Sequence, residues 1–343
     1  MNLNQSRRKG ESLTCGEGVS IRYYTATYHW DVLYSYSMKL YIIIIHVLLL
    51  LSSCKSDIKR EVTMADNVER SLQPEHCKVF RSDANSKHLL ILFGGYGQSP
   101  KDIEREFDIM DFANNHQIDL ILMNYSHNLW LEKNQKIELA SIIKDSISAY
   151  HLGLKDVYIG GFSSGGLNAL HLSNHLLGDK QAGIRLRGVF AVDSPIDLLA
   201  LYKSSKVNIE RNSSKLAFAE SQWIIQTLEK ELGNPENNIS NYETFSIYTS
   251  STNYTENLKH LRDIKIRFYS EPDSNWWKVN RDVKFEDTNA CKIEELYQVL
   301  LEEGFTNVEY IATANRGFRA NNIRHPHSWS IVDKEELADW IKR

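Results

Sequence analysis

Three residue types that together can activate a serine occur in this sequence in the order serine, carboxylate, histidine. The serine lies in the segment VYIGGFSSGG, where Gly161, Ser163 and Gly165 match the pattern G-x-S-x-G. A serine hydroxyl is a weak nucleophile until a neighbouring base accepts its proton and a third group fixes the tautomer of that base. The pattern therefore indicates nucleophilic attack on an acyl group.

The serine of this pattern is expected on a sharp turn between a strand and a helix. Residues 157–159 are apolar and β-prone, and leucine and alanine recur at helical spacing over residues 167–176. Such a turn strains the serine backbone by about 1–3 kcal/mol and leaves no room for a Cβ atom at the two flanking positions, which explains the glycines. It also favours Ser163 over Ser164, for which Phe162 would occupy the first glycine position.

Acid and base candidates follow three later strand-like runs, 187–192, 264–269 and 307–313. The carboxylates are Asp193, Asp197, Glu271 and Asp273, and the histidines are His325 and His327. Both kinds therefore stand after the serine and at strand ends, as the order serine, acid, histidine requires.

This constellation resembles the α/β-hydrolase superfamily of serine hydrolases over about residues 77–343. In that family the acid follows its strand by a short turn, which suits Asp273 better than Glu271. The family histidine precedes the closing helix in a His-Ser-aromatic context, which fits His327 in His-Ser-Trp and leaves His325 as a surface loop residue.

The resemblance implies a role for each residue. Ser163 is expected as the nucleophile, His327 as the general base and Asp273 as the acid that orients it. Asp193 or Asp197 stays open as the acid, as in some lipases of this fold.

The resemblance also implies an oxyanion hole made of backbone amides. One donor is expected from Ser164, the residue after the nucleophile. The second is expected from the turn GGYG after the apolar run 88–93, which is similar to the His-Gly-Gly-Gly loop of the family with Phe93 in place of the histidine. On that alignment the favoured amide is that of Tyr96, and that of Gly95 is next.

The alternation of strand-like and helix-like segments predicts an α/β fold with a mostly parallel central sheet flanked by helices. Strands are expected at 77–80, 88–93, 120–123, 157–159, 187–192, 264–269 and 307–313, and helices at 100–114, 135–152, 214–232, 291–303 and 333–342. Residues 200–262 interrupt this alternation of strands and helices. They are compatible with a helical cap over a pocket or with a helix that packs on the side of the sheet.

The amino-terminal region resembles a bacterial lipoprotein signal. From Met38 one lysine, an apolar run and small residues lead to Leu-Ser-Ser-Cys, in which Cys54 would be lipidated. We therefore expect residues 1–37 to be an upstream extension before the true start, 38–53 a signal peptide, 54–75 a lipidated tether and 76–343 the hydrolase domain. This places the protein in a bacterial cell envelope, held at the membrane by its lipid. Export leaves Cys77 and Cys291 either as a disulfide or as two buried thiols.

Composition narrows the other function classes. The formal net charge is −4 and no basic stripe dominates a segment, so nucleic acid is not an expected partner. No metal-ligand or phosphate-binding motif occurs, so no cofactor or metal is expected. Trp276 and Trp277 could line an acyl pocket, and Arg316, Arg319 and Arg324 could meet an anionic substrate, although packing and a solvated loop explain both sets.

The expected activity is hydrolysis of a carboxylic ester, of a small molecule or attached to a polymer, through an acyl-enzyme. The same residues would also suit a peptidase or a thioesterase. A binding lipoprotein that has lost turnover is the alternative outside enzymes.

Overall fold

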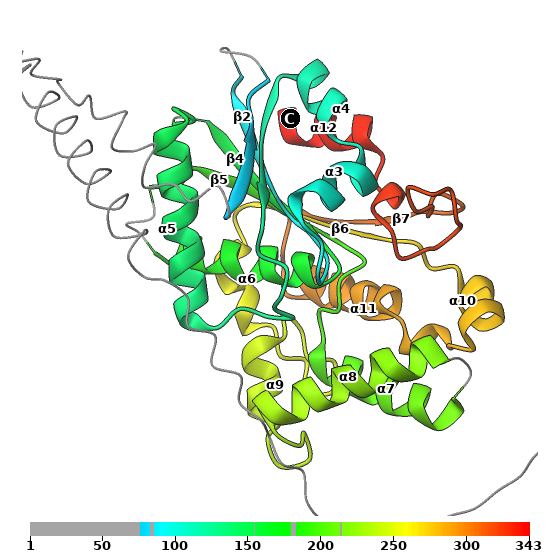
Figure 1. Ribbon diagram of the computed structural model, residues 1–343. Coiled ribbons are helices and arrows are strands. Elements are labelled where there is room, and N and C mark those ends of the chain that lie inside the picture. Colours follow the sequence, from blue (N-terminus) through cyan, green and yellow to red (C-terminus); the bar gives the residue numbers. More distant parts are fainter. Residues whose placement is uncertain (1–75, 83–85, 154, 180–182, 213–214) are drawn as a thin grey trace, which may run out of the picture. The chain divides into compact units, whose positions relative to one another are not determined.

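A mostly parallel sheet forms the centre of the computed structural model, which describes residues 76–343 except 83–85, 154, 180–182 and 213–214 (Figure 1). Within these residues seven strands follow the order β1-β3-β2-β4-β5-β6-β7. They are β1 (Cys77–Phe80), β2 (His88–Phe93), β3 (Ile118–Met123), β4 (Asp156–Phe162), β5 (Leu186–Val192), β6 (Lys265–Ser270) and β7 (Val308–Ala312). β1 pairs antiparallel with β3, and the other pairs are parallel. The predicted mostly parallel sheet is thus confirmed.

Helices cover both faces of the sheet because successive side chains of its strands point to opposite sides. β2 sends Leu89, Ile91 and Phe93 into one apolar core, and Leu90 and Leu92 into the other. The first face is covered by α5 (Lys133–Ala149), α6 (Ser164–Gly178) and α11 (Asn289–Glu302), and the second by α3 (Pro100–Phe107), α4 (Met110–His116) and α12 (Lys334–Lys342) (Figure 1). A sheet buried on both sides explains why β2 and β3 read as continuous apolar runs.

The helix expected over 100–114 is divided in two. Ser99 and Asp102 form a capping box that begins α3, and the helix ends where Asp108 adopts a left-handed conformation with φ 51°. α4 then begins at Met110. The prediction of one continuous helix was wrong because the apolar spacing alone did not reveal this stop.

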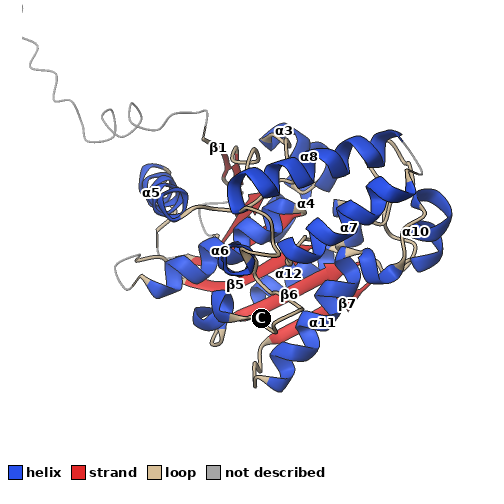
Figure 2. Cartoon of the chain, turned by 90° about the horizontal axis from the view of Figure 1, so that it is seen from below, coloured by secondary structure: helices blue, strands red, loops and turns tan. Residues whose placement is uncertain are grey.

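Three helices are inserted between β5 and β6: α7 (Leu198–Arg211), α8 (Lys215–Leu232) and α9 (Ile239–Phe245). α7 and α8 run side by side (Figures 1 and 2), and the hydroxyl of Tyr202 on α7 donates a 2.5 Å hydrogen bond to Glu229 on α8. Trp223 of α8 packs on Tyr96, which follows β2, with 4.5 Å between ring centroids. The sequence predicted α8 but not α7 or α9, and the contact with Tyr96 favours the cap interpretation, which stays a prediction.

The cysteines of the described part of the chain are free. Cys77 on β1 lies 3.5 Å from the hydroxyl of Ser146, and Cys291 on α11 lies beside Glu295. Burial raises the pKa of the Cys291 thiol to about 11 and also raises that of Cys77, so neither is an activated thiolate. Of the two states left open by the sequence, the structure has the thiols.

The expected signal peptide, Cys54 and the tether up to residue 75 lie outside the described residues. Among the helices that the structure describes, none has the length and the apolar character needed to span a bilayer.

Candidate active site

Ser163 stands on a strained turn between β4, the middle strand of the sheet, and α6. Its backbone has φ 55° and ψ −130°, a conformation that costs a non-glycine residue about 1–3 kcal/mol. A Cβ on Gly161 would lie 2.1 Å from the carbonyl oxygen of Gly165, and one on Gly165 would lie 2.3 Å from that of Gly94. The glycines are therefore required by backbone contacts on both sides of the serine, as the sequence pattern predicted.

Asp193 is the carboxylate that meets the histidine. His327 Nδ1 lies 2.6 Å from Asp193 Oδ2. Since an ionised carboxylate only accepts hydrogen bonds, Nδ1 carries a hydrogen, and in the neutral imidazole Nε2 then has the lone pair. This is the tautomer a general base needs in order to take a proton from a serine.

Backbone hydrogen bonds hold Asp193 beside the turn that carries Ser163. The N–H of Ser163 donates to the carbonyl of Val192, the last residue of β5, at 2.9 Å. Asp193 directly follows Val192. Asp193 is only 4% exposed, with φ 42°, and its N–H donates to Tyr269 on β6 at 2.8 Å. Asn289 at the start of α11 donates to its carbonyl at 2.9 Å.

Ring packing holds His327 close to the turn that carries Ser163. The imidazole lies against the ring of Phe162, the residue before Ser163, with 4.4 Å between centroids. Phe162 in turn packs on Trp329 at 5.4 Å. No hydrogen bond joins Ser163 and His327 within the described residues, and such bonds are often long in enzymes without substrate and tighten when it binds.

Asp273, expected as the acid, does not contact His327. Its carboxylate caps α10 (Ser274–Arg281), where it accepts from the N–H of Trp276 at 2.9 Å, and it pairs with Arg324 at 2.8 Å. The expectation is corrected because the helix after β6 begins at once and takes this carboxylate as its N-cap.

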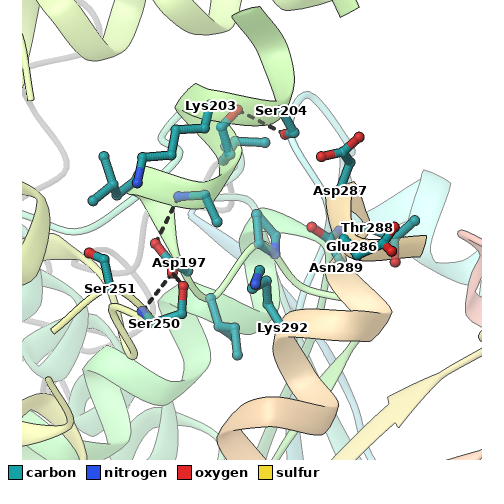
Figure 3. Close-up of a pocket in the computed structure, with 15 residues that line it drawn as sticks. Asp197, Lys203, Ser204, Ser250, Ser251, Glu286, Asp287, Thr288, Asn289 and Lys292 are labelled. Carbon is teal, nitrogen blue, oxygen red and sulfur yellow. Dashed lines mark hydrogen bonds between the residues drawn. The ribbon is translucent and has the colours of Figure 1, made fainter. Parts of the chain in front are cut away.

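Asp197, the other acid left open, is also used as a cap. It begins α7, accepting from the N–H of Ala200 at 2.9 Å, and binds Ser250 through the N–H at 2.8 Å and the hydroxyl at 2.7 Å (Figure 3). Of the carboxylates named by the sequence, Asp193 is therefore the one that the structure brings to His327.

Glu271 and Asp273 instead hold the loop that carries His327. Glu271 is 1% exposed and accepts from the N–H groups of Arg316 and Gly317, both at 2.9 Å. Its other oxygen pairs with Arg324, which also binds Asp273. Because Arg324 stands three residues before His327, the carboxylates at the end of β6 fix the approach of the histidine loop.

The turn after β2 lies against the serine and narrows the choice of oxyanion donors. A Cβ on Gly95 would lie 3.3 Å from Ser163 Cβ. The N–H of Gly95 is already donated to Gln98 Oε1 at 2.8 Å, and the same oxygen accepts from Trp329 Nε1 at 3.3 Å. No acceptor within the described residues takes the N–H of Tyr96, and the N–H of Ser164 stands at the first position of α6, where helices lack an internal acceptor.

His325 is half-buried in an aromatic and cationic setting, not a solvated surface residue. Its ring packs on Trp276 at 4.7 Å and Trp277 at 5.8 Å, and its Nδ1 accepts from the N–H of His327 at 3.2 Å. Burial, together with the positive charges of Arg319, Arg281 and Arg324, lowers the pKa of His325 to about 3. It is therefore a neutral ring that supports the backbone of His327. Trp276 and Trp277, for which the sequence left pocket lining or packing open, pack on it.

A cavity of about 210 Å³ opens beside the start of α7 (Figure 3). It is lined by residues of α7, the 250–251 turn and the start of α11, among them Asn289, which also binds Asp193. Neither Ser163 nor His327 lines it. Within the described ranges, no group of three or more His, Cys, Asp or Glu side chains is placed to hold a metal ion.

Comparisons with known proteins bear on the fold alone. A scan against protein-family models and a search of curated proteins found no match. Similar solved structures include a fluorophosphonate-binding serine hydrolase of Staphylococcus aureus, with 13% identity, a TM-score of 0.46, and coverage of 79% of this chain and 96% of that one.

An esterase of Pyrococcus furiosus has 15% identity and a TM-score of 0.44, with coverage of 78% of this chain and 85% of that one. An S-formylglutathione hydrolase of Staphylococcus aureus has 11% identity and a TM-score of 0.44, with coverage of 79% and 96%. At these values the similarity carries no argument about substrate or catalytic residues, so function is argued from the site.

Proposed function

We propose that this protein is a serine hydrolase that cleaves carboxylic esters through an acyl-enzyme. The observation that carries the proposal is the pair His327–Asp193, joined at 2.6 Å, beside a serine held at φ 55° between β4 and α6. A strained serine backbone and a buried carboxylate are both costly, and they are explained together by a site built to activate Ser163.

The first half of the reaction transfers the acyl group to the enzyme. Ser163 Oγ attacks the ester carbonyl while Nε2 of His327 takes its proton, and Asp193 stabilises the imidazolium that forms. The N–H groups of Tyr96 and Ser164 are the proposed donors to the oxyanion, and such donors each contribute about 10²–10³ in rate. His327 then gives its proton to the leaving alcohol.

The second half releases the acid. Water takes the place of the alcohol and attacks the acyl carbonyl while His327 removes its proton. The bond between the acyl carbon and Ser163 Oγ then breaks, and His327 returns the proton to Oγ, which releases the acid and regenerates Ser163. Both halves use the same donors and the same base, so the cycle needs no metal and no cofactor. A peptidase or thioesterase would use the same steps with a different leaving group.

Hydrolysis of p-nitrophenyl butyrate by the full chain tests the proposal. We expect steady turnover that Ser163→Ala abolishes. Ser173→Ala is the matched control. Ser173 is buried on α6, the helix that begins directly after Ser163, and its hydroxyl has no hydrogen-bond partner within the described residues. A folded protein that hydrolyses neither this ester nor a thioester or peptide analogue would support the binding-lipoprotein alternative.

We also propose that the protein is anchored in a bacterial cell envelope by a lipid on Cys54. The support is the signal-like sequence that ends in Leu-Ser-Ser-Cys. Mass spectrometry of the amino-terminal peptide from the membrane fraction tests it, since a lipid-modified Cys54 as first residue is expected and an unmodified, internal Cys54 would contradict it.

A further inference from the structure

Arg319 lies at the rim of the candidate active site. Its guanidinium stands over the ring of Phe162, with Cζ 5.8 Å from the centroid. The same ring packs on His327. A single side chain thus separates the guanidinium from the proposed base, and Phe162 is the residue directly before Ser163.

The other arginines of this loop have carboxylate partners, whereas Arg319 has none in the part of the chain that the structure describes. Arg316 pairs with Asp333 at 2.8 Å, and Arg324 with Glu271 and Asp273. For Arg319, no hydrogen bond or ion pair to the side chain occurs within the described residues. Its side chain is nevertheless half-buried.

The carboxylates near Arg319 do not fully balance its positive charge. Burial lowers the pKa of its guanidinium. Glu106 opposes this effect, Arg281 adds to it, and Asp193 and Glu220 oppose it less strongly. Asp193 is committed to His327, and Glu106 accepts from the N–H of Ala320 at 3.0 Å. A half-buried charge without a partner is costly, and a bound anion would remove that cost.

A second cation stands beside it. Arg281 at the end of α10 contacts His325, with 3.3 Å from Nη2 to Nε2. Arg319 and Arg281 both lower the pKa of His325. Two guanidinium groups from different elements therefore converge on the His327 side of the site, and guanidinium forks match the oxygens of carboxylate and phosphate groups.

We propose that Arg319, with Arg281 beside it, binds an anionic group, carboxylate or phosphate, on the alcohol portion of the ester substrate. This rests on the proposed function. The alcohol portion is assigned because His327 must hand its proton to the leaving alcohol, so that portion lies on the histidine side, where Arg319 is. The acyl portion lies toward the opposite side of Ser163.

Three acetate esters test this. 4-Acetoxybenzoate carries a carboxylate on the alcohol portion, 4-acetoxyphenyl phosphate carries a phosphate, and 4-acetoxybenzamide is a neutral analogue of similar shape. We expect the wild-type protein to favour at least one anion over the amide by about 10- to 100-fold in kcat/KM, beyond the difference in their chemical reactivity, as for a hydrogen-bonded charge pair. The anion with the larger gain identifies the source of the negative charge.

Arg319→Gln is expected to reduce this preference by about the same factor, and Arg319→Lys by less, because lysine keeps the charge but not the fork. Arg316→Gln is the matched control and should keep the wild-type preference. Each ratio compares two esters on the same protein, so a general loss of activity does not affect it. An equal preference in the wild type and Arg319→Gln overturns the proposal.

A measurement on the wild type alone covers the case in which Arg319→Gln does not fold. 4-Hydroxybenzoate or 4-hydroxyphenyl phosphate should inhibit hydrolysis of 4-acetoxybenzamide more strongly than 4-hydroxybenzamide does, and high salt should reduce the difference. Equal inhibition by all three overturns the anion site. If the wild type hydrolyses 4-acetoxybenzamide and shows no preference for the anionic esters, the anion site alone is refuted. If it hydrolyses none of the three esters, both the proposed function and this anion site are refuted.

Discussion

Asp193→Asn distinguishes the two carboxylates considered as the acid, and the structure gives the size of the effect. Asp193 accepts from His327 Nδ1 at 2.6 Å and is 4% exposed, so water cannot replace it. An asparagine amide in its place would donate to Nδ1 and leave the hydrogen on Nε2, where it blocks proton transfer from Ser163. We expect kcat to fall about 10³- to 10⁴-fold, or about 4–5.5 kcal/mol in activation free energy, as for the wrong tautomer in other triads.

Asp273→Asn is the matched comparison. Asparagine still caps α10, and Arg324 keeps Glu271 as a partner. The pair with Arg324 is 28% exposed on the aspartate side, so its loss should cost about 0–1 kcal/mol and less than tenfold in kcat. The assay is p-nitrophenyl butyrate hydrolysis, with thermal unfolding as the check that both variants fold. A larger loss in Asp273→Asn than in Asp193→Asn would refute the assignment.

Three further predictions concern the parts that hold the site. Gly165→Ala should lower the free energy of unfolding by about 3 kcal/mol or more, since its Cβ would meet Gly94 O at 2.3 Å, while Gly153→Ala, with no atom within 4 Å, should change it by less than about 0.5 kcal/mol in urea unfolding. Arg324→Gln should cost about 3 kcal/mol because it leaves buried Glu271 unpaired, and Glu271→Gln in the same chain should restore part of that loss; no recovery would contradict the ion-pair account. Because the pKa of His325 falls from 6.5 to about 3 on folding, the unfolded chain binds more protons between these values, so stability should fall as pH drops through this window and fall less steeply in His325→Gln; an unchanged slope would contradict it.

The sequence was sufficient to predict the features that have a local steric or chemical cause. The strained turn at Ser163 was predicted because only a glycine on each side fits it. His327 was singled out by the family resemblance, from its position before the closing helix. The sheet was legible because strands buried on both faces read as apolar runs. These features depend on residues near one another in the chain.

The carboxylate that contacts His327 was not the one predicted, because this contact joins residues far apart in sequence. Asp193 and Asp273 both follow strands, and only the folded loop decides which one meets His327, 134 residues beyond Asp193. A signal was present: Asp197 and Asp273 each precede a helix as its N-cap, and recognising both caps would have left Asp193 and Glu271. Helix α10 was missed because its eight residues bury no apolar side chain.

Labelling with a fluorophosphonate, followed by peptide mapping, tests whether Ser163 is an activated nucleophile. The reagent forms a covalent adduct only with an activated serine, so it reports on the nucleophile without knowledge of the substrate. We expect an adduct on Ser163 of the full chain, strongly reduced in His327→Ala and in Asp193→Asn. A folded protein that forms no adduct at Ser163, or forms it equally in His327→Ala, would contradict this expectation.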